Sequence, residues 1–158
     1  MSGIYLVVWD EEQKEQSVVL KATKGGYPHC TLVYSGKHLT GDHLIELSNA
    51  AMATFALKQL VLSKSYVNSF TKEDGTERYD VLMEVENTEK LERFRTHMLK
   101  SLGNADKLFM NPLHVTHAIY STKEEAEEGL KQLDEHLPKK VVITGVTIDW
   151  TYEKKINS

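Results

Sequence analysis

The alternation of apolar and polar residues along the chain predicts an ordered series of strands and helices. Runs rich in β-branched and aromatic residues predict strands, whereas apolar residues three and four positions apart predict amphipathic helices. The expected strands cover residues 4–9, 17–22, 27–35, 60–70, 78–85, 112–121 and 141–152, the last with a bend at Gly145. The expected helices are one over 42–57, one capped by Asn87 and ended by Gly103, and one that begins with a capping box at Thr122 and is stopped by Pro138.

Each expected helix has one apolar stripe that should face a core. The stripes contain Leu44, Leu47, Ala51 and Phe55 in the first helix, Leu91, Phe94 and Met98 in the second, and Ala126, Leu130 and Leu133 in the third. Strands 4–9 and 17–22 should form one hairpin, and strands 60–70 and 78–85 another, because Asp74-Gly75 is typical of tight turns. The order of the elements indicates an α+β fold with an internal pseudo-duplication.

Two short motifs recur in matching contexts more than half the chain apart. His29-Cys30-Thr31 and His114-Val115-Thr116 each lie in an expected strand that begins next to a proline and runs through Tyr-Ser into a helix. A third match, His38-Leu39-Thr40, lies between two glycines in a segment with turn chemistry and is interpreted as a loop. The His and Thr of the first tripeptide are called the N-terminal motif, and those of the second the C-terminal motif.

The strand context places the His and Thr of each motif on a common face, because side chains alternate between the two faces of a strand. Cys30, Val115 and His117 then point to the opposite, more apolar face. We therefore expect Cys30, the only cysteine of the chain, to be a buried structural thiol. His117 should lie away from any site that the motifs form.

Composition and charge restrict the partners. The net charge is −4, and the sequence has no basic stripe that could follow the phosphates of a long nucleic acid. It has no apolar run long enough for a membrane span, and its first ten residues lack the features of a signal peptide. We expect one cytoplasmic domain over residues 1–158 that acts as a monomer, with neither a membrane nor a long nucleic acid as its partner.

Two histidines and two threonines on one surface suit the cleavage of a phosphodiester. The reaction needs a base to deprotonate the attacking oxygen, an acid to protonate the leaving oxygen, and neutral donors for the phosphoryl oxygens. Histidine serves in either role near neutral pH because its unperturbed pKa is about 6.5. With a ribose 2′-OH or water as the nucleophile, the chemistry requires neither a cofactor nor a metal.

The motifs have two alternative interpretations, a structural role and a zinc site. The motif histidines could be satisfied structural residues, although the matching strand contexts argue against this for both motifs together. A zinc site made from His29, His114 and His117 is disfavoured because alternation separates His117 from the other two, and because no Asp or Glu is expected on the face of the motifs.

The arrangement resembles the two-histidine (2H) phosphoesterase superfamily, whose LigT-like fold brings one His-x-Thr motif from each of two lobes to a central cleft. The resemblance implies a pseudo-duplicated α+β fold in which antiparallel sheets line the cleft and helices pack outside. It implies that His29 and His114 are the general acid and base and that Thr31 and Thr116 contact the phosphate. His117 departs from the apolar residue that the family usually has after the motif.

Within the superfamily, the compact length and the acidic balance look most like the phage anti-CBASS enzymes, which hydrolyse cyclic oligonucleotide signals and would act in the host cytoplasm. The alternative enzyme is an RNA 2′,3′-cyclic or 2′,5′ phosphodiesterase. An alternative of another class is a non-catalytic module that sequesters a nucleotide or a protein partner. A small nucleotide is the expected ligand of either enzyme, and Tyr5 and Trp150 are the candidates for stacking on its base, although core packing explains both equally well.

Overall fold

The protein is represented by a computed structural model that describes residues 2–10, 19–20, 28–35, 41–101, 107–108 and 113–148. The strands are β1 (Ser2–Trp9), β2 (His29–Ser35), β3 (Gln59–Thr71), β4 (Glu77–Val85), β5 (Lys107–Leu108), β6 (His114–Tyr120) and β7 (Lys139–Ile148). The helices are α1 (Gly41–Phe55), α2 (Glu89–Ser101) and α3 (Lys123–Asp134). None of the helices in these ranges is long and apolar enough to cross a membrane.

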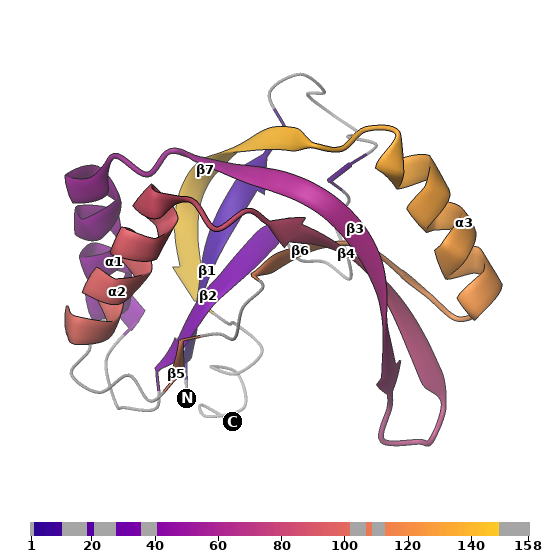
Figure 1. The fold of residues 1–158 in the computed structure, drawn as a ribbon. Coiled ribbons are helices and arrows are strands. Elements are labelled where there is room, and N and C mark those ends of the chain that lie inside the picture. The colour runs from indigo at the N-terminus through magenta and orange to yellow at the C-terminus, as the bar shows by residue number, and fades with distance from the viewer. Residues whose placement is uncertain are drawn as a thin grey trace.

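The strands join into one antiparallel sheet that closes on itself. Their order is β1-β7-β3-β4-β6-β2-β5, and β1 also pairs with β2, so that six strands form a barrel and β5 extends β2 outside it. The α+β class is therefore confirmed, with the expected antiparallel sheets united into a single closed one. In Figure 1, α1 and α2 lie side by side at one end of the sheet, and α3 lies beside the β3–β4 hairpin.

The barrel has an internal two-fold relation. Exchanging β1 with β4, β2 with β6 and β3 with β7 preserves every pair of neighbouring strands. Helices α1 and α3 obey the same exchange, since α1 connects β2 to β3 and α3 connects β6 to β7. Helix α2 lies between β4 and β6 and has no counterpart among the described residues between β1 and β2. Two halves with little sequence identity beyond the motifs thus have the same connectivity.

The irregularities of the sheet repeat under this exchange. The register of β1 against β2 shifts between Ile4 and Tyr5, and the register of β4 against β6 shifts between Val81 and Leu82. Each shift lies beside the threonine of a motif, because Tyr5 is opposite Thr31 and Leu82 is opposite the threonine of the C-terminal motif. Bulges of this kind redirect side chains locally and often lie next to functional sites.

A second pair of bulges follows the same relation. One extra residue in β7, Thr144, donates its hydroxyl to the carbonyl oxygen of Val7 at 3.3 Å. The corresponding extra residue in β3, Ser63, donates its hydroxyl to the carbonyl oxygen of Glu84 at 3.2 Å. The bend expected at Gly145 is therefore present as a bulge at the preceding residue.

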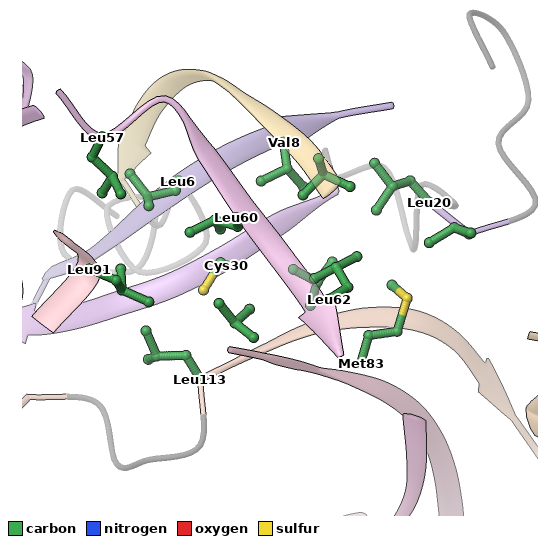
Figure 2. Close-up of a cluster of buried hydrophobic side chains, with 14 of the residues drawn as sticks. Leu6, Val8, Leu20, Cys30, Leu57, Leu60, Leu62, Met83, Leu91 and Leu113 are labelled. Atoms are coloured by element: carbon green, nitrogen blue, oxygen red, sulfur yellow. The ribbon is translucent and has the colours of Figure 1, made fainter. Parts of the chain in front are cut away.

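The hydrophobic core lies between the walls of the barrel. Figure 2 shows Leu6, Cys30, Leu62 and Met83, which come from four different strands, gathered where β3 crosses β1 and β2. The helices contribute the stripes expected from the sequence: Leu91, Phe94, Met98, Ala51, Ala126 and Leu133 are buried, and Leu47, Phe55 and Leu130 are partly buried against the core. The side chain of Leu44 lies outside the described residues.

Two sequence predictions about local structure are wrong. Of the expected strand over 17–22, only Val19 and Leu20 are described; they lie in no strand and are buried in the core. The expected hairpin partner of β1 is replaced by β2 and β7, which pair with β1 on its two sides. The cap of α2 is Thr88 rather than Asn87, because the hydroxyl of Thr88 accepts from the backbone N–H of Leu91 at 3.3 Å. Thr122 caps α3 as expected.

Candidate active site

The two motifs meet because β2 and β6 are neighbouring strands. Cys30 of β2 is paired with Val115 of β6, and both side chains are completely buried in the core. The residues on either side of this pair, which are the His and Thr of each motif, therefore point to the opposite face of the sheet. We call this opposite surface the motif face.

The pairing of Cys30 with Val115 also relates the motifs to each other. Both residues are the middle residue of a His-x-Thr tripeptide, so the internal two-fold relation passes between them. Continuing the antiparallel register places Thr31 beside His114 and Thr116 beside His29. Each histidine thus has the hydroxyl of the other motif as a cross-strand neighbour, and all four side chains are partly buried.

The two histidines interact electrostatically. Burial lowers the pKa of His114 below its ordinary value of 6.5, and the charge of His29 lowers it further, whereas the carboxylate of Asp80 raises it. An imidazole that is held neutral in this way can accept a proton near neutral pH. The two imidazoles are therefore close enough for the charge of His29 to affect the protonation of His114.

The N-terminal histidine is stacked on an aromatic ring. The centroids of the Tyr5 and His29 rings are 4.5 Å apart, and their planes differ by 20°. At the equivalent position of the other half, Leu82 faces the C-terminal motif, with 4% of its surface exposed. Tyr5 therefore lies at the site, as expected, but one face of its ring is already occupied by the histidine.

Carboxylates reach the motif face from a neighbouring strand. Glu84 of β4 is paired with His114, and its Oε2 lies 3.2 Å from Nζ of Lys64. The prediction that no Asp or Glu lies on the face of the motifs is wrong, because Glu84 and Asp80 reach this face from β4, whose pairing with β6 has no local sequence signal. Within the described ranges, no group of three or more His, Cys, Asp or Glu side chains is placed to hold a metal ion.

The remaining candidates have structural surroundings or lie outside the described part of the chain. Burial raises the pKa of the Cys30 thiol to about 12, so this cysteine is an inert core residue, as expected. His117 is buried away from the motif face, and its Nδ1 donates to the carbonyl oxygen of Val19 at 2.7 Å. Trp150 and the loop motif at His38 lie outside the described residues.

The comparisons with known proteins add no identification. No protein-family model matches this sequence, and no match to a curated protein was found.

Proposed function

We propose that this protein is a phosphodiesterase that cleaves small nucleotides with the histidines of its two motifs. The observation that carries the proposal is the antiparallel pairing of Cys30 with Val115, which gathers two histidines and two threonines on one face. A purely structural role does not explain why histidines occupy equivalent positions in the two related halves. The electrostatic interaction of His29 with His114 supports their acting on one substrate.

The four side chains suffice for a balanced reaction. One histidine accepts the proton of the attacking water or ribose 2′-OH as its oxygen forms a bond to phosphorus. The other histidine donates a proton to the leaving oxygen as the second phosphorus–oxygen bond breaks. The two threonine hydroxyls donate hydrogen bonds to the non-bridging phosphoryl oxygens, where charge is redistributed in the transition state.

His114 is the better candidate for the base. Its partly buried position and the neighbouring histidine favour its neutral form, which is the form that accepts a proton. His29 then acts as the acid, with its imidazole ring held against Tyr5. The reverse reaction, or the hydrolysis of a cyclic intermediate, uses the same two groups with their roles exchanged.

The proposed fold is LigT-like, and the proposed substrates are cyclic oligonucleotide second messengers of antiviral signalling. The two-fold exchange of strands, with one motif on each half, supports the fold assignment. The substrate class and a cytoplasmic location follow from the resemblance of the sequence to the phage anti-CBASS group. The competing enzymatic activity is an RNA 2′,3′-cyclic or 2′,5′ phosphodiesterase, and the competing non-catalytic role is sequestration.

A substrate panel separates these functions. The purified protein in EDTA is incubated with cyclic di-AMP, cyclic tri-AMP, 2′,3′-cyclic AMP and a 2′-5′ oligoadenylate, and the products are separated by chromatography. We expect multiple turnovers of a cyclic oligonucleotide, loss of turnover in His114→Ala, and wild-type turnover in the control His136→Ala, whose side chain is exposed two residues after the end of α3. Retention of a nucleotide without product would instead favour the sequestering module, and rapid opening of 2′,3′-cyclic AMP alone would favour the RNA enzyme.

A further inference from the structure

The β3–β4 hairpin extends the motif face beyond the catalytic motifs. Leu82 of β4 is paired with Thr116 of β6, so both side chains lie on this face. Asp80 and Arg78 follow on β4 at intervals of two residues and therefore share the face. On the opposite side of the hairpin lies α3, whose residue Asp134 accepts a hydrogen bond from the Ser65 hydroxyl of β3 (Figure 1).

An exposed aromatic ring lies at the far part of this extension. Phe70 of β3 is paired with Arg78, and 49% of its surface is exposed. Cζ of Arg78 lies 4.7 Å from the centroid of the Phe70 ring. Among the described residues, only Trp9 is a comparably exposed large apolar side chain.

The guanidinium of Arg78 is held in place by Asp80. Nε of Arg78 lies 2.8 Å from Oδ1 of Asp80, and Nη2 donates to Oδ2 at 3.0 Å. The hydrogen bond from Nη2 and the close approach of Nε restrain the guanidinium group, and the carboxylate neutralises its charge. The exposed Phe70 ring is therefore supported by a restrained guanidinium whose charge is balanced, and a flat surface with little net charge suits a nucleobase better than a phosphate.

The distance from the motifs shows which base could reach this surface. Arg78 is four residues along β4 from Leu82, the neighbour of Thr116, and four residues of extended strand span roughly 13 Å. A nucleotide whose phosphate is bound between the motifs has only one sugar between that phosphate and its own base. A base on Phe70 would therefore belong to a neighbouring nucleotide of the same substrate.

The described residues of the other half contain no counterpart of Asp80, which anchors this surface. Under the two-fold relation, Leu82 corresponds to Tyr5, and Asp80 corresponds to Gly3, which has no side chain to anchor a guanidinium. The motifs are symmetric, whereas in the part of the chain that the structure describes this extension is found on the side of His114. A substrate that uses it has one orientation across the two histidines.

We infer that Phe70 and Arg78 form a binding site for a nucleobase adjacent to the cleaved phosphodiester, and that the substrate is accordingly an oligonucleotide rather than a mononucleotide. This inference rests on the proposed phosphodiesterase function and adds to it a site for the neighbouring base and, with it, an orientation of the substrate. The base stacks on the exposed Phe70 ring while Arg78 supports the ring through its cation–π contact.

The test compares substrates of different length in Phe70→Leu, which keeps an apolar side chain but removes the aromatic face. Loss of one base stack corresponds to roughly a 5- to 150-fold change. We expect the ratio of kcat/KM for cyclic tri-AMP to kcat/KM for 2′,3′-cyclic AMP to fall about tenfold, mainly through KM for cyclic tri-AMP. Phe70→Trp should restore the ratio, and Ser69→Ala, on the opposite face of the same strand, should leave it unchanged. An unaltered ratio in Phe70→Leu overturns the inference while leaving the phosphodiesterase proposal intact.

A binding measurement covers the case in which no substrate is turned over. A 2-aminopurine-labelled RNA trinucleotide is titrated into the His29→Ala/His114→Ala protein with and without Phe70→Leu, and quenching of the 2-aminopurine reports stacking. Quenching that depends on Phe70 supports the base site even if catalysis fails. Equal quenching, or equal absence of it, in both proteins overturns it, and a circular dichroism spectrum confirms that each variant is folded.

Discussion

At the scale of single residues, the two motif histidines share a face but have different surroundings. His29 is stacked on Tyr5, whereas His114 is partly buried, faces Glu84 across the β4–β6 pair and feels the charge of Asp80. This difference breaks the symmetry of the two motifs. It also makes the protonation of His114 a measurable property that depends on named neighbours.

Asp80→Asn should lower the pKa of His114 further. The carboxylate raises this pKa, and its removal leaves burial and the charge of His29 unopposed. NMR titration of the His114 imidazole should show a midpoint below 6.5 in the wild type and a lower one in Asp80→Asn. If the His114 imidazole is the base, the acidic limb of the plot of kcat/KM against pH should move to lower pH together with this pKa. Asp74→Asn, in the exposed hairpin turn, is the control. An unchanged or higher pKa of His114 in Asp80→Asn would contradict the influence of the Asp80 carboxylate on this histidine.

The same lowered pKa has a consequence for stability. Between the folded pKa of His114 and the unfolded value of about 6.5, the unfolded chain binds more protons than the native protein. The contribution of His114 to the free energy of unfolding is therefore fully present above pH 6.5 and is lost as the pH falls through this window. Chemical denaturation across the window measures the contribution as the difference between wild type and His114→Asn.

The motif residues were predictable from the sequence, but their neighbours were not. Alternation along a strand is local, so it predicted the shared face of each His and Thr and the burial of Cys30. Asp80, Glu84 and Leu82 reach the site through the pairing of β4 with β6, which no local pattern reveals. Stacking of Tyr5 on His29 likewise depends on which strand lies beside β2.

At the scale of the elements, the beginning of α2 distinguishes two adjacent capping candidates. Asn87 and Thr88 are both favourable caps by residue type. The hydroxyl of Thr88 accepts from the N–H of Leu91, and the carbonyl of Thr88 accepts the helical bond from Glu92 at 3.0 Å. Sequence reasoning chose the wrong one because a shift of one position lies within the usual uncertainty of a helix boundary.

Thr88→Ala should destabilise the protein by about 1 kcal/mol, because it removes an acceptor for one of the unpaired N–H groups of the first turn. Asn87→Ala is the matched control, since Asn87 is exposed and precedes the cap. Urea denaturation of the two variants gives the comparison directly. A larger loss in Asn87→Ala than in Thr88→Ala would show that the helix begins one residue earlier.

The prediction of a strand at Val19 and Leu20, the described residues of the 17–22 segment, is wrong for a different reason. Val19 and Leu20 have the composition of a strand, and both are buried, so the apolar signal was correct about burial. Strand partners for β1 are already supplied by β2 and β7. The carbonyl oxygen of Val19 instead accepts a hydrogen bond from His117. This contact joins distant parts of the chain, and no local sequence pattern predicts it.

At the scale of the whole molecule, closure of the barrel interleaves the two halves. Around the barrel, β1–β7, β3–β7, β3–β4 and β2–β6 join strands from different halves, whereas only β1–β2 and β4–β6 lie within one half. The pseudo-duplication was predictable from the order of the elements and the repeated motifs. The closure was not, because it depends on pairings between strands at opposite ends of the chain.

Interleaving predicts that the protein unfolds as one cooperative unit. Transitions monitored by far-UV circular dichroism and by tryptophan fluorescence should coincide in urea. Leu62→Ala, which leaves a cavity where β3 packs on the core, should shift both transitions together and cost about 2–5 kcal/mol. Two separated transitions, with only one of them moved by Leu62→Ala, would mean that the halves are independent domains.

If the two motifs act on the substrate as one site, the decreases in kcat/KM caused by removing each histidine should not be independent of each other. The decisive measurement is kcat/KM for the best cyclic oligonucleotide substrate in wild type, His29→Ala, His114→Ala and the double variant, all in EDTA. We predict that each single substitution lowers kcat/KM by roughly 10²- to 10⁴-fold and that the double variant is little worse than the poorer single variant, as expected for groups that work as a unit. Wild-type turnover in either single variant, or a double variant that loses the product of two independent factors, would contradict a shared acid–base site.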